Sequence, residues 1–187
     1  MLEQLGFALE LLKQKRDEAQ AALTALQGLP GLEAQRRELA DYPKTGWAEL
    51  KAQHRLPPKA AVLPYSSRFD GVGRPMPNLC LKLPTGGGKT LLAAAAVGQL
   101  MSRWLQRHTG LVLWVVPNDA IYQQTLKTLN DRDHPYRQLL NLAGAGRVKI
   151  LEKTSALTRQ DVDSHLCVMV LMLASAARQS KETLRFF

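Results

Sequence analysis

The stretch from Pro84 to Thr90, which reads Pro-Thr-Gly-Gly-Gly-Lys-Thr, constrains the fold of this chain more than any other. The apolar run Leu79–Leu83 precedes it, and an alanine-rich run follows it. Glycines let the backbone curl until several N–H groups point inward, and a helix that begins near Lys89 adds its positive dipole end. A strand, a glycine turn and a helix in this order form a cradle for a polyphosphate. We therefore predict a nucleoside triphosphate site, with Leu79–Leu83 as its preceding strand.

The residues of this loop have separate predicted roles. Lys89 is expected to reach the β- and γ-phosphates, and the Thr90 hydroxyl to bind the Mg²⁺ ion that bridges them. The phosphates are expected to lie against the loop residues Thr85, Gly86, Gly87 and Gly88. The general phosphate-loop pattern has a glycine where this chain has Leu83. A glycine-rich surface turn that carries a lysine is the alternative, and the flanking strand and helix patterns argue against it.

Composition sets broad limits. The chain has 187 residues, 45% of them hydrophobic and 22% charged, which is ordinary for a globular protein and predicts one principal domain. Its longest uncharged apolar run, residues 166–177, is shorter than the ~20 residues of a bilayer crossing, so we expect no membrane segment and a cytoplasmic location. Cys80 and Cys167 lie in apolar runs, which predicts buried free thiols rather than a disulfide or a metal pair.

The positive charge is unevenly distributed. Residues 1–57 hold eight Lys or Arg and eight Asp or Glu, whereas residues 58–187 hold seventeen and eight and so carry the entire net charge of +9. One triphosphate does not require nine charges, so a polyanionic partner such as nucleic acid is the natural explanation. A basic surface without a partner remains the alternative.

The N-terminal third reads as helical. Apolar residues recur at three- and four-residue steps from Leu5 to Leu26, Gly28–Gly31 ends this helix, and Leu32–Ala40 is expected to form a second one. We predict a helical hairpin, with an oligomerising coiled coil as the alternative. A turn at 41–46, a short helix at 47–54 and a loop at 57–77 are expected to follow, and Tyr65, Arg68 and Phe69 in that loop either contact a nucleotide base or belong to a linker.

The remainder alternates strands with helices. The run Leu111–Val116 has the composition of a strand buried on both faces, Ala120–Leu129 is helical, and residues 148–151 and 166–173 are further strands. This order predicts an α/β domain with a parallel sheet and flanking helices. We place the domain boundary after residue 57, so that residues 1–57 hold the hairpin and a linker, and residues 58–187 hold the α/β domain.

Two motifs resemble one known family. The loop Pro84–Thr90 is similar to motif I of superfamily 2 helicases and translocases, which often lacks the first glycine of the general pattern, and Pro117–Gln124 is similar to their motif Ia. Pro117 and Gln124 match motif Ia, whereas Asn118 stands where threonine is usual. The sequence from Val115 to Lys127 resembles that of the motor subunit of type III restriction enzymes and related DEAD/DEAH-box proteins. The stretch 171–175 lies where these proteins have motif Ib.

The resemblance covers roughly residues 75–187 and implies a function. It implies a RecA-like P-loop NTPase domain that uses ATP and Mg²⁺ in a helicase or translocase, with a role in restriction-modification and anti-phage defence. Double-stranded DNA is the implied partner, possible further partners are methyltransferase or nuclease subunits, and Pro117, Asn118, Gln124 and Ser175 are the implied contacts to the nucleic-acid backbone. For Asn118, a helix cap is the alternative role.

The resemblance also implies parts that this sequence does not contain. Motors of this kind need an acidic box after a later strand and arginines from a second RecA-like domain, and no such box follows an apolar strand here. We therefore expect the N-terminal part of the first motor domain of a longer ATP hydrolase, and expect these 187 residues alone to be inactive. The alternative is a module that binds a nucleotide or a partner without hydrolysis. A small-molecule P-loop kinase is disfavoured, because no lid-type arginine cluster is apparent.

Overall fold

The computed structural model describes residues 1–173, which divide into two compact units. The N-terminal unit extends to Lys82, and the C-terminal unit begins at Leu83. This structural division follows Lys82, whereas the boundary that we infer from sequence follows Pro57. The assignment of 1–57 and 58–187 as functional parts therefore stays a prediction. No helix among the described residues is long and apolar enough to cross a membrane.

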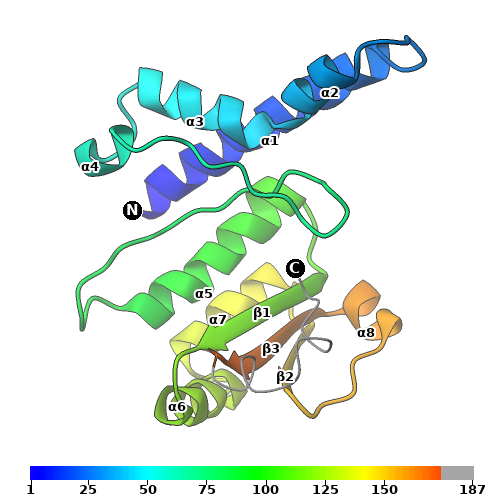
Figure 1. The fold of residues 1–187 in the computed structure, drawn as a ribbon. Helices are drawn as coiled ribbons and strands as arrows, with labels where there is room; N and C mark the ends of the chain where they lie inside the picture. The colour runs from blue at the N-terminus through cyan, green and yellow to red at the C-terminus, as the bar shows by residue number, and fades with distance from the viewer. Residues whose placement is uncertain (174–187) are drawn as a thin grey trace. The chain divides into compact units, whose positions relative to one another are not determined.

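The N-terminal unit is helical. It contains α1 (Leu2–Ala25), α2 (Glu33–Ala40), α3 (Tyr42–Ala52) and α4 (Pro58–Ala61). The guanidinium of Arg36 donates to the carbonyl oxygens of Leu26 and Leu29, which joins α2 to the end of α1 and forms the predicted hairpin (Figure 1). The apolar stripe of α1 packs on α3, through Ala8, Leu11, Leu12 and Leu50.

The helix α3 begins earlier than predicted. We expected a turn at residues 41–46, but α3 starts at Tyr42 and has Pro43 in its first turn. Proline is tolerated there because the N–H that it lacks would have no partner within the helix. Gly46 then lies against α1, where an added Cβ would be 2.8 Å from Leu12 Cδ2. The predicted turn was therefore wrong, because its proline marks a helix start.

The C-terminal unit is an α/β domain, as predicted. In chain order it contains α5 (Lys89–Gln99), the π-helix η1 (Leu100–Leu105), β1 (Gly110–Val116), α6 (Asp119–Asn130), α7 (Pro135–Ala143), β2 (Val148–Glu152), α8 (Arg159–Ser164) and β3 (Leu166–Met172). The three strands form a parallel sheet in the order β1-β3-β2. Val168 of β3 stands opposite Val112 of β1 and Ile150 of β2. This is a partial RecA-like P-loop fold with flanking helices.

One face of the sheet carries the core of this unit. Alternate side chains of the three strands pack against α5, α6 and α7, and the fully buried members include Ala94, Leu129, Leu140, Leu166, Val168 and Val170. The alternate residues of β1, Leu111, Leu113 and Val115, are at least 40% exposed among the described residues. Since strand side chains alternate between faces, the apolar run of β1 serves two different environments.

The predicted strand Leu79–Leu83 is absent from the sheet. The chain is extended there but pairs with no strand of the described residues, and Leu79 is 41% exposed. Cys80 is exposed as a result, so its predicted burial was wrong, whereas Cys167 is a buried free thiol as expected. An apolar run becomes a strand of a sheet only when a neighbouring strand supplies its hydrogen bonds. The sequence of the run alone does not show whether that neighbour is present.

Two helices of the C-terminal unit, α7 and α8, were not predicted, and neither was the four-residue α4 within the predicted loop 57–77. In α7, His134 Nδ1 accepts from the backbone N–H of Tyr136 and Pro135 occupies the first turn. In α8, Thr158 and Asp161 form a reciprocal capping box. Both are short, which explains why the periodicity of their apolar residues was not evident.

A buried arginine holds α6, α7 and β2 together. Arg137 is 8% exposed, and its guanidinium donates to the carbonyl oxygens of Leu129 (2.8 Å) and Val148 (3.1 Å) and to Asn141 Oδ1 (3.0 Å). Burial lowers the pKa of Arg137 from its ordinary value. Its donors reach acceptors in three elements, including a carbonyl at the C-terminal end of α6, where a cation is favoured.

We predict that Arg137→Met lowers the free energy of unfolding by about 2–3 kcal/mol, because the Leu129 and Val148 carbonyls lose their charged donor. Urea unfolding followed by circular dichroism measures this change. The matched control is Arg132→Met, at an exposed position of the preceding loop, which is expected to change stability by less than about 0.5 kcal/mol. Equal stability of the Arg137 variant and the wild type would contradict the structural role.

An ion pair fixes α8 to β2. Lys149 Nζ donates to Asp161 Oδ1 at 2.8 Å, and the backbone N–H and hydroxyl of Thr158 donate to Asp161 Oδ2. The hydrogen bond from Lys149, followed by those from Thr158, holds the pKa of Asp161 well below its usual range. The folded state therefore favours the ionised carboxylate more than the unfolded state does.

We predict that this ion pair makes stability sensitive to acid. A depressed folded pKa gives a stabilisation that is present above the unfolded pKa of about 4 and is lost as the pH falls through the folded pKa. Asp161→Asn should therefore show a smaller loss of unfolding free energy between pH 5 and pH 2 than the wild type. Asp163→Asn, at an exposed carboxylate of the same helix, is the control and should keep the wild-type pH profile.

Candidate nucleotide-binding site

The phosphate loop begins with a tight turn. The N–H of Gly87 donates to the carbonyl oxygen of Pro84 at 3.1 Å, and Gly86, the third residue of this turn, has φ of +79°. A turn of this type requires a positive φ at its third position, which glycine adopts without strain. At Gly87 itself, an added Cβ would lie 3.0 Å from the Pro84 carbonyl oxygen. The loop conformation therefore depends on glycine at both positions.

A helix N-terminus follows directly. Gly88, with φ of +74°, is the N-cap of α5, and the first helical hydrogen bond runs from the N–H of Leu92 to the carbonyl of Gly88. Within residues 1–173, the backbone N–H groups of Lys89, Thr90 and Leu91 have no acceptor. Free N–H groups and the positive end of the helix dipole together favour an anion at this position. The predicted helix start at Lys89 is confirmed.

The two side chains predicted to bind the triphosphate and its Mg²⁺, Lys89 and Thr90, differ in their hydrogen bonds. Lys89 Nζ donates to the carbonyl oxygen of Pro84 at 2.9 Å, so its ammonium lies against its own loop. The Thr90 hydroxyl makes no hydrogen bond among the described residues and is half-buried. Thr85 is exposed. A neutral hydroxyl oxygen beside free N–H groups fits the ligand set that Mg²⁺ and a phosphate would require.

The loop lies at the carboxyl-terminal end of the parallel strands. Helix α5 and η1 run back along the sheet, and the N–H of Arg107 bonds to the Met101 carbonyl just before β1 begins at Gly110. The N-terminus of α5 therefore lies at the same end of the sheet as the last residue of β1 (Figure 1). Ligands of open α/β sheets bind at this edge, because the helix N-termini converge there.

The predicted motif Ia residues lie at the same edge. Pro117 follows β1 directly and is exposed, and Asn118 is the N-cap of α6. Asn118 Oδ1 accepts from the N–H of Ile121 at 3.0 Å, so its capping role is observed. Gln124, one turn further along α6, is exposed. Ser175 lies outside the described residues.

A carboxylate at this edge was not singled out from the sequence. Glu152 is the last residue of β2, and its Oε2 accepts from the hydroxyl of the buried Tyr122 at 3.4 Å. Burial, followed by the charge of Glu152, raises the pKa of Tyr122. The available signal was an acid placed directly after the buried Leu151. Within residues 1–173, no group of three or more His, Cys, Asp or Glu side chains could hold a metal ion.

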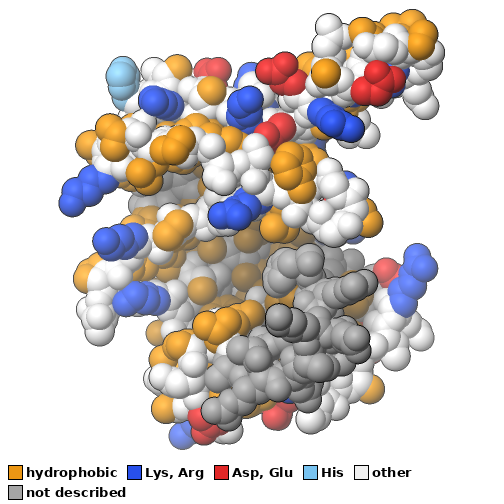
Figure 2. Space-filling view, in the orientation of Figure 1, with side chains coloured by type: hydrophobic (Ala, Val, Ile, Leu, Met, Phe, Trp, Pro, Cys, Tyr) orange, Lys and Arg blue, Asp and Glu red, His pale blue; other side chains and the backbone are white. Residues whose placement is uncertain are grey.

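On the face that Figure 2 draws, the described Lys and Arg side chains of each unit, taken by itself, form no continuous basic patch. Lys and Arg side chains are instead dispersed among hydrophobic and neutral ones. The net charge of +9 therefore does not by itself identify a nucleic-acid surface. The two helix N-termini at the strand ends are the more specific feature.

This combination defines a class of protein. A glycine turn with positive φ, free N–H groups at a helix start and a parallel sheet together form a P-loop nucleotide-binding domain. Within that class, the chain belongs to the family described as "Type III restriction enzyme, res subunit", whose model matches residues 48–185. It is thus a member of a helicase-like, ATP-dependent motor family. No curated protein and no solved structure matches the chain.

Proposed function

We propose that this chain supplies the ATP-binding portion of an ATP-dependent DNA helicase or translocase of the type III restriction kind. In this proposal it is the N-terminal part of a longer motor whose acidic box and second RecA-like domain lie outside these 187 residues. The observation that carries the proposal is the phosphate loop, with free N–H groups of α5 at the carboxyl end of a parallel sheet. The family match supports it.

Each loop residue has a role in the proposal. The N–H groups of Gly88 to Leu91 and the α5 dipole would hold the β- and γ-phosphates of ATP. Lys89 would leave the Pro84 carbonyl and bond to a phosphate oxygen, and Thr90 would contribute its hydroxyl to Mg²⁺. Mg²⁺ would supply charge neutralisation on the phosphates when bound.

DNA is the proposed second ligand. The α6 N-terminus presents N–H groups and small polar side chains at the edge that follows β1, which suits the sugar-phosphate backbone rather than base edges. Pro117, Asn118 and Gln124 are the proposed contacts within the described residues. Double-stranded DNA is the proposed form of nucleic acid, and methyltransferase or nuclease subunits are the proposed further partners; the family match supports a nucleic-acid partner in general.

The second candidate function is a module that binds a nucleotide or a partner without hydrolysis. It is favoured by the sequence, which has no acidic box after an apolar strand to orient an attacking water. The two functions differ in turnover. DNA-stimulated ATP hydrolysis by the full-length gene product supports the motor, whereas nucleotide binding without turnover under the same conditions supports the module.

For nucleotide binding, we predict that Lys89→Ala weakens the affinity for MgATP at least about tenfold, since a charge-assisted hydrogen bond to a phosphate is lost. Titration calorimetry or a fluorescent ATP analogue measures the change, and turnover by the 187-residue chain itself is expected to be undetectable. Lys82→Ala, which removes an exposed lysine just before the loop, is the matched control and should bind like the wild type. Unchanged affinity in the Lys89 variant would refute the site.

For DNA, we predict that Asn118→Asp weakens binding to a short duplex about fivefold in low salt, because the carboxylate repels phosphates. Aspartate is also a good N-cap, so the fold is retained, which circular dichroism checks. Asn130→Asp places the same charge at the other end of α6 and is the control. Equal loss of affinity in both variants would show a general charge effect and exclude a contact at Asn118.

A further inference from the structure

Residues 68–76 of the N-terminal unit form a short hairpin. The N–H of Asp70 donates to the carbonyl oxygen of Arg74 at 2.9 Å, and the N–H of Met76 donates to that of Arg68 at 2.8 Å. These bonds pair the backbone on either side of the loop 71–73, and three residues are a common length for such a connection. We term residues 68–76 the Asp70 hairpin.

The side chain of Asp70 holds the loop of this hairpin in place. Its Oδ1 accepts hydrogen bonds from the backbone N–H groups of Val72 (3.0 Å) and Arg74 (2.8 Å), and its Oδ2 accepts from Arg74 Nε (2.7 Å). Gly73, with φ of +78°, occupies the last loop position, where the backbone turns through the left-handed region. The carboxylate of Asp70 is therefore paired with a cation of its own hairpin.

The chain around this hairpin is strongly basic. Residues 51–82 hold six Lys or Arg and one acid, Asp70, whereas residues 1–50 of the same unit hold six and eight. All six cations of residues 51–82 are exposed, and among the described residues Arg74 alone of them forms an ion pair. The positive charge of the N-terminal unit is therefore concentrated in residues 51–82, where no further acid compensates it.

This excess of positive charge argues for a polyanionic partner. A segment of the same protein that covered residues 51–82 would have to place acidic side chains against the cations other than Arg74. A nucleic-acid strand instead carries a negative charge on every phosphate, so cations that are dispersed along the surface can each meet a different phosphate. The charge therefore favours nucleic acid over the protein's own chain as the occupant of this surface.

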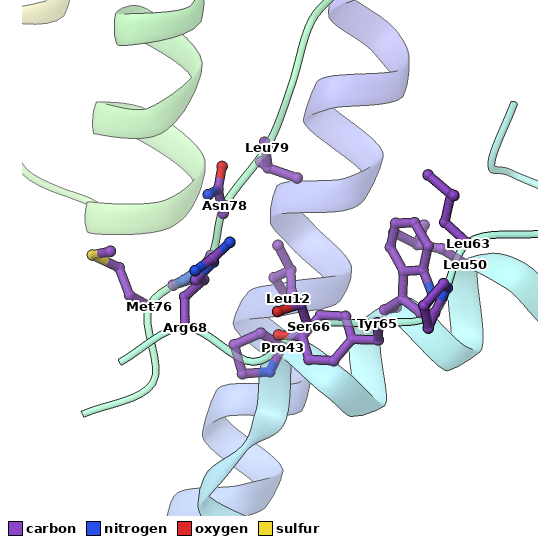
Figure 3. A pocket seen from close by; sticks show the side chains of 13 residues that line it. Leu12, Pro43, Leu50, Leu63, Tyr65, Ser66, Arg68, Met76, Asn78 and Leu79 are labelled. Carbon is purple, nitrogen blue, oxygen red and sulfur yellow. The ribbon is translucent and has the colours of Figure 1, made fainter. Parts of the chain in front are cut away.

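The Asp70 hairpin also exposes an aromatic ring. Phe69 is 51% exposed, and its ring makes no contact with another ring or a cation among the described residues. Side chains alternate along an extended strand, so Phe69 lies on the face opposite Arg68. Figure 3 shows the other face, where Arg68 lies with Asn78 at the end of a pocket away from Leu63. An exposed ring in a basic region is suited to stacking with a nucleic-acid base.

We propose that the Asp70 hairpin binds single-stranded nucleic acid, with an unpaired base stacked on the Phe69 ring and the adjacent phosphates bound by Arg68 and Arg74. The long arginine side chains reach past the edge of a two-stranded hairpin, and that of Arg74 is 78% exposed despite its bond to Asp70. Stacking accepts any base, so the contact tolerates different sequences. The proposal shares only the class of ligand with the proposed function, and Asn118→Asp tests a different unit, so either can fail alone.

The first test measures the binding of fluorescein-labelled oligo(dT) to the 187-residue chain by fluorescence anisotropy in low salt. Phe69→Ala is expected to weaken binding about tenfold, because one stacked base is lost. Val62→Ala, which removes a 79% exposed apolar side chain outside the hairpin, is the matched control and should bind like the wild type. Unchanged affinity in the Phe69 variant, or an equal loss in both variants, would overturn the proposal.

The phosphate contact has its own variant. Arg68→Gln is expected to weaken oligo(dT) binding about fivefold in low salt and to make the affinity less dependent on salt, because one phosphate contact is lost. Arg37→Gln removes an exposed cation of α2, in the acidic part of the same unit, and is the control. An equal loss in both variants would show a general charge effect and count against the hairpin.

A tryptophan at the stacking position reports the contact directly. In Phe69→Trp, oligo(dT) should quench the added emission, and duplex DNA should quench it less because its bases already stack on one another. Equal quenching by ATP would assign the ring to a nucleotide base and overturn the proposal. The same response to oligo(dT) is expected in the full-length gene product. Emission that does not respond there would show that the protein's own chain covers the ring, and would also overturn the proposal.

Discussion

The C-terminal unit depends on the parallel pairing of β3 with both of its neighbours. β3 is the last described strand in the chain but the central one in the sheet, so β1 and β2 are joined only through it. Leu166, Val168 and Val170 are fully buried, which reflects this position. Because the strands are parallel, their carboxyl ends coincide at one edge, and the helix N-termini gather there. The location of the candidate site follows from this pairing.

The phosphate loop adds a local constraint to that arrangement. Gly86 and Gly88 both have positive φ, a conformation that glycine adopts without strain, so the turn and the N-cap of α5 favour glycine. α5 then returns along the sheet to β1, and its core residues Ala94 and Val97 fix the direction in which the loop opens. The N–H groups without acceptors at the start of α5 are a consequence of this geometry.

The features predictable from sequence were those governed by local chemistry. The glycines at 86 and 88 indicated the turn, Pro117 and Asn118 indicated the end of β1 and the cap of α6, and the β-branched run at 111–116 indicated a strand. Some of the missed features are also local, namely the start of α3 at its proline and the capped helices α7 and α8, whereas others depended on partners distant in the chain. Leu79–Leu83 has strand composition without a pairing strand among the described residues, and the contact of Glu152 with Tyr122 joins residues 30 positions apart in the sequence.

Two positively charged side chains of this unit, Arg137 and Lys89, have different roles. Arg137 is structural, and Lys89 is available to a ligand. Arg137 is buried and bonded to three acceptors in α6, α7 and β2, so its removal leaves carbonyls without donors. Lys89 is exposed and makes one hydrogen bond, to a carbonyl oxygen that carries no net charge. A phosphate oxygen is itself negatively charged and so attracts the ammonium more strongly than a neutral carbonyl does, which favours the exchange from Pro84 to a phosphate. The weakness of the Lys89–Pro84 contact is therefore what keeps this lysine free to act.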